Sequence, residues 1–168
     1  MRIYLIGYMC SGKTKTGKAL ATAMRYKFLD TDVMIEEETG KTIHRIFDEK
    51  GEEYFRKLET KILQATASHS KLVVATGGGL PCFHDNMSWM NEHGITVYLE
   101  ANDGLLFHRL AMSKQGRPLI ENLNDVALME RISRDLVERT PVYELAAIKV
   151  NAANLNLNSL QQKIGKLK

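Results

Sequence analysis

Apolar runs alternate with amphipathic stretches along all 168 residues of the chain. Short runs of strand-forming residues predict five strands, at 2–6, 27–29, 72–75, 95–99 and 147–150. Periodic patterns between and after these runs predict helices, over 13–25, 33–39, 42–49, 52–67, 85–92, 103–112, 125–138 and 159–167. In the helix over 52–67, Phe55, Leu58 and Ile62 recur on one face. The alternation predicts an α/β protein with three layers, α/β/α, around a central parallel sheet of about five strands.

The predicted elements form one domain over 1–168, since no linker, internal repeat or low-complexity tract interrupts them. The stretch 113–124 departs from the periodic pattern, because it is polar and contains Gly116 and Pro118. It has the profile of a mobile loop that can close as a lid. Ligands of open parallel sheets bind beyond the carboxyl ends of the strands. We therefore expect the chemistry to lie after the first three strands.

Composition and charge argue against several classes of protein. The hydrophobic fraction of 44% and the charged fraction of 26% are typical of a soluble globular domain. A net charge of +3 does not indicate binding to nucleic acid or to a membrane, and no apolar run is long enough to span a bilayer. The two cysteines do not suggest a disulfide framework, and the five histidines lack the spacing of metal ligands. A cytoplasmic monomer is expected.

Residues 7–14 read GYMCSGKT and match the phosphate-binding pattern G-x-x-x-x-G-K-[ST]. The pattern lies between a predicted strand and a predicted helix, which is the setting that a P-loop requires. Backbone N–H groups of such a loop curl around phosphate oxygens, and the helix directs its positive end at the same anion. Lys13 would reach the outer phosphates, and the Thr14 hydroxyl would join the shell of Mg²⁺. The sequence predicts a nucleoside triphosphate site, the alternative being a glycine-rich turn.

Two carboxylates, Asp30 and Asp32, follow the second predicted strand. One could hold the metal, and the other could accept the proton of a substrate hydroxyl. The alternative is that Asp32 is the N-cap of the next helix, where Asp is favoured. The two interpretations are compatible, and the sequence alone gives them equal weight.

Three glycines, Gly77, Gly78 and Gly79, follow the third predicted strand. Glycines are costly to order and expose bare N–H groups, so close approach to a ligand is favoured over a plain turn. They also stand where many P-loop proteins carry an aspartate at the end of a strand. Asp30 is therefore the candidate metal ligand.

Three arginines are candidates for binding anions. Arg56 lies one residue off the apolar helix face between Glu52 and Glu59, so a solvated ion pair is the simpler interpretation. Arg117, in the predicted lid, could stabilise charge on a transferred phosphoryl group, or could be a surface residue before a proline turn. Arg139 stands two residues before a proline that ends or kinks its helix. Its planar fork could bind a carboxylate or cap helix carbonyls.

Taken together, these segments resemble shikimate kinases. Matching residues occur in family order over essentially the whole chain, at 7–14, 30–32, 46–47, 51–52, 55–59, 76–79, 117–119 and 139–143. The resemblance implies a P-loop kinase fold of the nucleoside-monophosphate-kinase type. It also implies transfer of the γ-phosphoryl group of ATP to the 3-hydroxyl of shikimate, with Mg²⁺ as cofactor. Substrate-binding helices would lie at about 32–60 and the lid at about 113–124.

The resemblance also implies roles for individual residues. Shikimate would be held by Asp32, Arg56, Gly77, Gly78, Gly79 and Arg139, with the two arginines on its carboxylate. ATP would bind Gly7, Cys10, Ser11, Gly12, Lys13, Thr14 and Lys15, with Arg109 on one side of the adenine, Asn151 to Asn154 on the other, and Arg117 arriving with the lid. Thr14 and Asp30 would hold the metal, and Lys13, Asp32 and Arg117 would act in catalysis.

Two P-loop residues depart from the family pattern, which usually has glycine in place of Cys10 and serine or threonine in place of Lys15. A side chain at Cys10 is strained if that residue needs a positive φ. Lys13 and a helix N-terminus lie nearby, and both can activate a thiol. We hypothesise that modification of Cys10 inhibits nucleotide binding, the alternative being a small residue tolerated in a turn. Lys15 either attracts phosphate or faces solvent.

Two other functions remain open from the sequence. One is a different small-molecule kinase of the same fold, such as a gluconate kinase. Asp32, Arg56, the three glycines and Arg139 argue instead for a cyclic substrate that bears a carboxylate. The other is a protein that resembles shikimate kinase and binds its ligands without catalysis, which only the altered P-loop favours.

Overall fold

A computed structural model of the protein describes residues 1–112, 120 and 123–167. Five strands form one sheet, β1 (Arg2–Ile6), β2 (Lys27–Asp30), β3 (Leu72–Ala75), β4 (Ile95–Glu100) and β5 (Ile148–Asn151). The sheet has the order β2-β3-β1-β4-β5, and all four pairings are parallel. Parallel neighbours need crossover connections, and helices supply them. The α/β fold with a central parallel sheet is as the alternation of patterns predicts.

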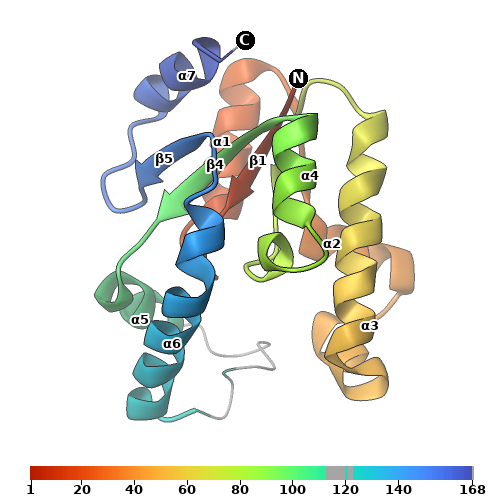
Figure 1. Ribbon diagram of the computed structural model, residues 1–168, viewed down its shortest axis with the longest axis vertical. Coiled ribbons are helices and arrows are strands. Elements are labelled where there is room, and N and C mark those ends of the chain that lie inside the picture. The colour runs from red at the N-terminus through yellow and green to blue at the C-terminus, as the bar shows by residue number, and fades with distance from the viewer. Residues whose placement is uncertain (113–119, 121–122, 168) are drawn as a thin grey trace.

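The helices of the described residues are α1 (Lys13–Met24), α2 (Thr31–Thr39), α3 (Ile43–Ala65), α4 (Asn86–His93), α5 (Asp103–Ala111), α6 (Asp125–Tyr143) and α7 (Leu157–Gly165). Two short 3₁₀ turns, η1 (Thr66–Ser68) and η2 (Leu80–Cys82), flank β3. Figure 1 shows the helices on both faces of the sheet, with both chain termini at the end opposite the carboxyl edge. Within the described part of the chain, no helix combines the length and the apolar character needed to cross a membrane.

Alternate residues of β1 supply the two halves of the core. Ile3 and Leu5 pack with α1 and α7 on one face, in a cluster that includes Leu20 and Leu160. On the other face, residues of α3, α4 and α6 surround Tyr4 and Ile6, in a cluster of Leu63, Leu72, Val74, Leu80, Met87, Met90, Tyr98 and Tyr143. A strand buried on both faces reads as a continuous apolar run, as β1 and β3 do. These two clusters fix the direction of the strands and hence the edge at which the chemistry lies.

Helices extend beyond the sheet at its carboxyl edge. The pair α2 and α3 lies on one side and the pair α5 and α6 on the other (Figure 1). Each pair has its own apolar cluster, one built around Phe55 of α3 and the other around Leu106 of α5. Of the predicted lid at 113–124, only Ile120, Leu123 and Asn124 are described. Ile120 is buried in the α5–α6 cluster, and the Asn124 side chain caps α6.

Two helices differ from the sequence prediction by more than a shift of one or two residues at an end. The predicted break between 49 and 52 is a kink inside α3, where Gly51 takes φ 78° and ψ 173°. Helix α6 continues through Pro141 to Tyr143, five residues beyond the predicted end at 138. An internal proline removes one helix hydrogen bond and costs about 3 kcal/mol. Tyr143 is fully buried, so packing of the last turn onto the sheet offsets that cost.

Candidate active site

The P-loop joins β1 to α1 at the carboxyl edge of the sheet. Gly7 and Gly12 have φ of 135° and 104°, conformations that glycine adopts without strain. A Cβ on Gly7 would lie 2.7 Å from a backbone oxygen of Leu99. The buried Lys13 Nζ donates hydrogen bonds to the carbonyl oxygens of Gly7 and Tyr8, both at 2.8 Å. The loop therefore curls around the lysine ammonium group and holds it at the start of α1.

A cavity of about 530 Å³ opens beside this loop. Its walls include the predicted nucleotide residues Cys10, Ser11, Gly12, Lys15 and Arg109, together with Thr16, Ala19, Ala152, Ala153, Leu155 and Leu157. Ser11 Oγ is buried and has no hydrogen-bond partner within the described part of the chain. A buried hydroxyl without a partner is costly, so this oxygen is suited to contact a ligand atom. The size of the cavity is that of a small-molecule site.

Arg109 of α5 braces the P-loop from the cavity side. Its Nη1 donates to the carbonyl oxygens of Cys10, at 3.0 Å, and Ser11, at 3.2 Å. The guanidinium therefore lies in the wall of the cavity beside the P-loop, and its predicted place beside an adenine stays a prediction. Asn154 differs, because Ala153 and Leu155 line the cavity and Asn154 does not.

Cys10 takes the left-handed backbone conformation, with φ 60°. This is the case in which a side chain at that position is strained, by about 1–2 kcal/mol relative to glycine. The half-buried side chain lies against the α5–α6 apolar cluster and lines the cavity beside the P-loop. A group attached to its sulfur would therefore occupy space in that cavity.

Thr14 and Asp30 meet where α1 begins and β2 ends. Thr14 Oγ1 donates to Asp30 Oδ2 at 2.8 Å. Asp30 Oδ1 accepts the backbone N–H of Asp32 at 3.1 Å, so Asp30 is the N-cap of α2. The N-cap interpretation of Asp32 is therefore wrong by two residues, and Asp32 stands in the first turn instead.

The Thr14 and Asp30 oxygens suit Mg²⁺, which binds one or two protein oxygens and completes its shell with phosphates and water. No cluster of three or more His, Cys, Asp or Glu side chains able to hold a metal occurs in the described ranges. A metal at this place would therefore depend on oxygens of a bound nucleotide.

A second cavity, of about 310 Å³, lies between α2, α3 and α6. It brings together the predicted acceptor residues Asp32, Arg56, Gly77, Gly78, Gly79 and Arg139, with Val33, Glu36, Ile43, Phe47, Phe55 and Glu59. Met9 of the P-loop is part of the same wall. The P-loop thus borders both cavities, with Met9 on this one and Cys10 on the other.

The Asp32 carboxyl opens into this second cavity. Loss of bulk water and the nearby Asp30 charge raise the pKa of Asp32 to about 6, although Lys13 and Arg56 oppose the shift. Asp32 as a residue is nevertheless exposed, because it lines the open cavity. A carboxyl with a pKa near neutrality is a better proton acceptor than an ordinary aspartate.

Arg56 is buried, contrary to the solvated ion pair that its sequence neighbours suggest. Its Nη1 donates to Glu59 Oε2 at 2.7 Å, and its Nη2 donates to Glu52 Oε1 at 2.8 Å. The guanidinium also lies 4.4 Å from the ring centre of Phe83. Burial raises the pKa of Glu59 to about 7 against the opposing effect of Arg56. The ion pairs of Arg56 with Glu52 and Glu59 that the spacing predicts are present, and they fix the Arg56 guanidinium in the cavity wall.

Close packing explains the three glycines. A Cβ on Gly77 would lie 2.5 Å from Glu59 Oε1, and a Cβ on Gly79 would lie 2.7 Å from Arg56 Nη1. On Gly78, the nearest atom would be the backbone nitrogen of Met9, at 3.1 Å. Side chains at these positions would displace the charged groups or the P-loop. The glycines therefore let the end of β3 approach both the charged groups of α3 and the P-loop.

Arg139 enters the same cavity from the opposite side, on α6. Its Nη2 donates to Asp135 Oδ2 at 3.1 Å, and its guanidinium carbon lies 5.4 Å from the ring centre of Tyr8. Tyr143, one turn further, donates from its hydroxyl to the carbonyl oxygen of Gly78 at 2.6 Å. Two arginines on separate elements thus face one cavity, which is an arrangement that can bind a carboxylate from both sides.

Several residues of the site were missed by the sequence analysis. These are Asp135, Tyr8 and Tyr143, which hold Arg139 and the end of β3 in place. The spacing of Arg131, Asp135 and Arg139 at intervals of four was a usable signal, because such residues share a helix face. Tyr8 carried no such signal, since its partner is 127 positions away. Arg117, the third predicted arginine, lies outside the described residues.

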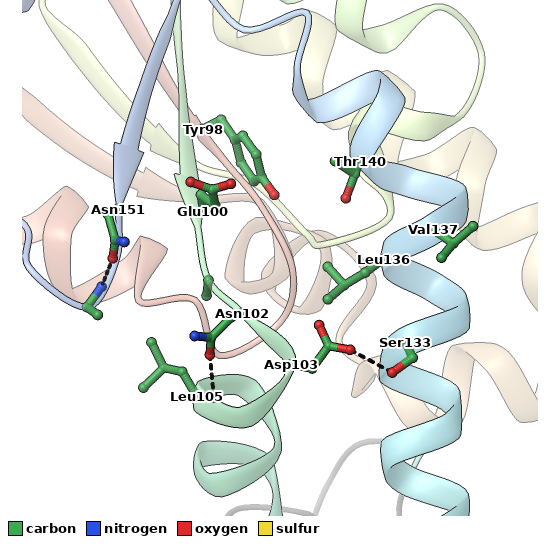
Figure 2. A pocket seen from close by; sticks show the side chains of 12 residues that line it. Tyr98, Glu100, Asn102, Asp103, Leu105, Ser133, Leu136, Val137, Thr140 and Asn151 are labelled. Carbon is green, nitrogen blue, oxygen red and sulfur yellow. Dashed lines mark hydrogen bonds between the residues drawn. The ribbon is translucent and has the colours of Figure 1, made fainter.

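A third cavity, of about 510 Å³, lies between β4, α5 and α6 and is shown in Figure 2. Its polar groups are engaged in local structure. Asp103 accepts a hydrogen bond from Ser133 at 2.6 Å, and Asn102 caps α5 through the N–H of Leu105. Asn151, expected beside the adenine, lines this cavity and not the one at the P-loop. No lysine or arginine is among its described lining residues, so it does not suit a phosphate.

The fold and the two cavities at the P-loop define a nucleotide-dependent small-molecule kinase. The family model for shikimate kinase matches residues 9–167. A shikimate kinase from Phocaeicola vulgatus is 44% identical over 98% of this chain and 99% of its own length. The crystal structure of shikimate kinase from Bacteroides thetaiotaomicron superimposes with a TM-score of 0.88 at 41% identity, covering 99% of this chain and 96% of that one. The chain belongs to the shikimate kinase family.

A further solved structure adds information on the ligand. Shikimate kinase from Acinetobacter baumannii, in complex with shikimate, superimposes with a TM-score of 0.85 at 36% identity. The match covers 99% of this chain and 91% of that chain. Membership of the family over nearly the full length argues against the gluconate kinase alternative.

Proposed function

We propose that the P-loop of this shikimate kinase divides its site into a nucleotide cavity and an acceptor cavity, with the reacting groups meeting at 7–14. The reaction of the family transfers the γ-phosphoryl group of ATP to the 3-hydroxyl of shikimate. One observation carries the proposal. The cavity that holds Asp32 and two arginines shares the P-loop with the cavity that holds Ser11 and Arg109. A donor and an acceptor bound on either side of one loop are suitably placed for direct transfer.

The nucleotide side supplies positive charge and N–H groups. Lys13 would exchange its contacts with the loop carbonyls for oxygens of the outer phosphates, and Ser11 Oγ would gain the partner that it lacks. Arg109 would border the nucleotide while bracing the loop. Arg117 would approach from the segment between α5 and α6, as the family resemblance implies, to stabilise charge on the transferred group.

Thr14 and Asp30 are the residues that fit Mg²⁺. Bound there with the nucleotide, the ion would neutralise charge on the phosphate oxygens. The hydrogen bond between the two side chains already places a hydroxyl and a carboxylate oxygen 2.8 Å apart, at the end of β2 beside the P-loop helix. Asp32, two residues further along, is then available to contact the acceptor.

The acceptor side recognises an anionic polyol. Arg56 and Arg139 would bind the carboxylate of shikimate from opposite walls, and apolar residues such as Phe47 and Phe55 would cover its ring. Asp32 would accept a hydrogen bond from the attacking hydroxyl. As the oxygen bonds to the γ-phosphorus and the bond to the bridging oxygen of ADP breaks, the hydroxyl proton would pass to Asp32.

A coupled assay of ADP release tests the proposal against its two alternatives. ADP should form when ATP, Mg²⁺ and shikimate are all present. No ADP should form when gluconate replaces shikimate or when the acceptor is omitted. Activity with gluconate alone would support the other kinase. Binding of both ligands without turnover would support a non-catalytic protein.

We further propose a cytoplasmic monomer that needs neither nucleic acid nor membrane, for which gel filtration of the purified enzyme is the first test.

Glu52 is expected to compete with the substrate for Arg56. It occupies the Nη2 side of the guanidinium, yet about half of its own side chain is exposed. An ion pair with one exposed partner is worth up to about 1 kcal/mol, which is about fivefold in affinity. We expect Glu52→Gln to lower the KM for shikimate by up to about fivefold. Glu53→Gln, which removes the surface pair with Lys57, is the matched control. A higher KM in Glu52→Gln alone would show that Glu52 supports binding.

Alkylation of Cys10 is expected to abolish activity, and ATP should protect against it. The side chain lines the nucleotide cavity, so an added group would exclude the nucleotide. Iodoacetamide inactivation should slow by about tenfold with saturating ATP. A Cys10→Gly variant should resist inactivation and tolerate the local backbone. Cys82→Ala is the control, because burial raises the pKa of the Cys82 thiol and disfavours its reaction. Full activity after complete labelling of Cys10 would overturn the hypothesis.

A further inference from the structure

A buried carboxylate on α6 joins the acceptor cavity to the P-loop. Asp135 is 3% exposed and accepts hydrogen bonds on both of its oxygens. Oδ1 accepts from Arg131 Nε at 2.8 Å. Oδ2 accepts from Arg139 Nη2 at 3.1 Å and from the Tyr8 hydroxyl at 2.9 Å. A buried charge is stable only when it is paired and hydrogen-bonded, and three donors meet that need here.

The contact with Arg139 determines where that guanidinium lies. Arg139 is held by the Asp135 carboxylate and lies over the face of the Tyr8 ring. A planar guanidinium that binds a carboxylate through two parallel hydrogen bonds must present its N–H groups in one orientation. Without Asp135, the Arg139 side chain would lose the carboxylate that fixes its Nη2 and would keep only its contacts with Tyr8 and Tyr143. Asp135 itself is absent from the residues that line the acceptor cavity, so its effect on the substrate is indirect, and Arg139 is the partner of Asp135 that lines this cavity.

The contact with Tyr8 reaches the other half of the site. Tyr8 belongs to the P-loop, and its side chain is 1% exposed. Its carbonyl oxygen accepts the hydrogen bond from Lys13 Nζ, while its hydroxyl donates to Asp135. One carboxylate therefore anchors an acceptor-side arginine and the loop that holds the phosphate-side lysine.

Building on the function proposed above, we infer that Asp135 is a positioning residue that orients Arg139 toward the acceptor's carboxylate and ties its position to the P-loop through Tyr8. The net charge of Asp135, Arg131 and Arg139 is +1, so the cluster keeps an excess positive charge for an anionic acceptor. Asp135 serves binding of shikimate more than the chemical step, because it lines neither cavity and its partner Arg139 lines the acceptor cavity.

Asp135→Asn tests the inference with little change in shape. Three donors face this side chain, and an amide has only one oxygen, so its NH₂ group must face a donor. We expect the KM for shikimate to rise by about tenfold, with kcat and the KM for ATP changed by less than about threefold. In an Arg139→Ala background, the same substitution should change the KM for shikimate by less than about twofold, since Asp135 acts through Arg139.

Asp103→Asn is the matched control. Asp103 also bonds to α6, through Ser133, but lines the third cavity (Figure 2), whereas Arg139 lines the acceptor cavity. Its KM for shikimate should stay within about twofold of wild type. An Asp135→Asn enzyme with wild-type KM for shikimate overturns the inference, as does an undiminished effect in the Arg139→Ala background. If Arg139→Ala itself leaves this KM unchanged, the carboxylate clamp of the proposed function fails instead.

Tyr8→Phe keeps the inference testable if Asp135→Asn does not fold, as judged by circular dichroism. The substitution removes one hydroxyl and leaves the ring beneath Arg139. The KM for shikimate should rise by about threefold, although Tyr8 does not line the acceptor cavity. An unchanged KM for shikimate in a folded Tyr8→Phe enzyme would contradict the link between the two halves of the site.

Discussion

Replacing Asp32 with asparagine is expected to lower kcat by about a thousandfold while leaving the KM for shikimate nearly unchanged. Asparagine keeps the size of the side chain and an oxygen for the acceptor hydroxyl, but it cannot take a proton at neutral pH. The raised pKa of Asp32, about 6, makes the native carboxyl an effective base that is still ionised at pH 7.5. General base catalysis contributes about 10²–10⁴ in rate, which sets the size of the effect.

The measurement is steady-state kinetics at saturating ATP, with shikimate as the varied substrate. Glu38→Gln is a suitable control, because Glu38 is a carboxylate of the same helix whose partner is the surface Lys61. A kcat for Asp32→Asn within about tenfold of wild type would show that Asp32 only positions the hydroxyl. A large rise in KM with unchanged kcat would assign Asp32 to binding.

Replacing Arg56 or Arg139 with lysine is expected to raise the KM for shikimate by about fiftyfold in each case, with a smaller effect on kcat. Lysine keeps the positive charge but loses the planar fork that matches a carboxylate. The lysine variants are preferable to alanine at Arg56, because alanine would leave the buried Glu59 without its cation. An unpaired buried charge costs about 3–5 kcal/mol and would confuse binding with folding.

Calorimetric titration with shikimate measures these effects without turnover. Arg45→Lys provides the control at an exposed arginine of the same helix, α3, whose partner is Glu49. Thermal unfolding of each variant separates a lost contact from a lost fold. Wild-type affinity in both Arg56→Lys and Arg139→Lys would contradict the clamp, whereas loss in only one would assign the carboxylate to that arginine.

Sequence predicted the parts of the site that depend on local chemistry. The P-loop pattern fixes a loop between a strand and a helix, and the structure places Gly7, Gly12 and Lys13 accordingly. The alternation of apolar runs predicted the sheet, whose carboxyl edge gathers the P-loop, Asp30 and the glycines after β3. These features follow from backbone geometry, which short sequence patterns can predict.

Tertiary contacts determine the features of the site that the sequence did not predict. Spacing alone suggested an exposed Arg56. The residue is buried because Phe83 and Glu59 contact it once α3 lies beside the end of β3. The proline in α6 suggested a helix end, yet the burial of Tyr143 carries the helix past it. The contact of Asp135 with Tyr8 left no sign in the sequence, since the two residues are 127 positions apart.

The shared P-loop wall is the central feature of this account, because it would place a phosphoryl donor and an anionic acceptor on either side of Met9 and Cys10. Analysis of the product by ³¹P and ¹H NMR tests that claim most directly. Incubation with ATP, Mg²⁺ and shikimate should give one phosphate ester, at the 3-hydroxyl, in a 1:1 ratio with ADP. Inorganic phosphate without an ester, or an ester at another hydroxyl, would contradict the account.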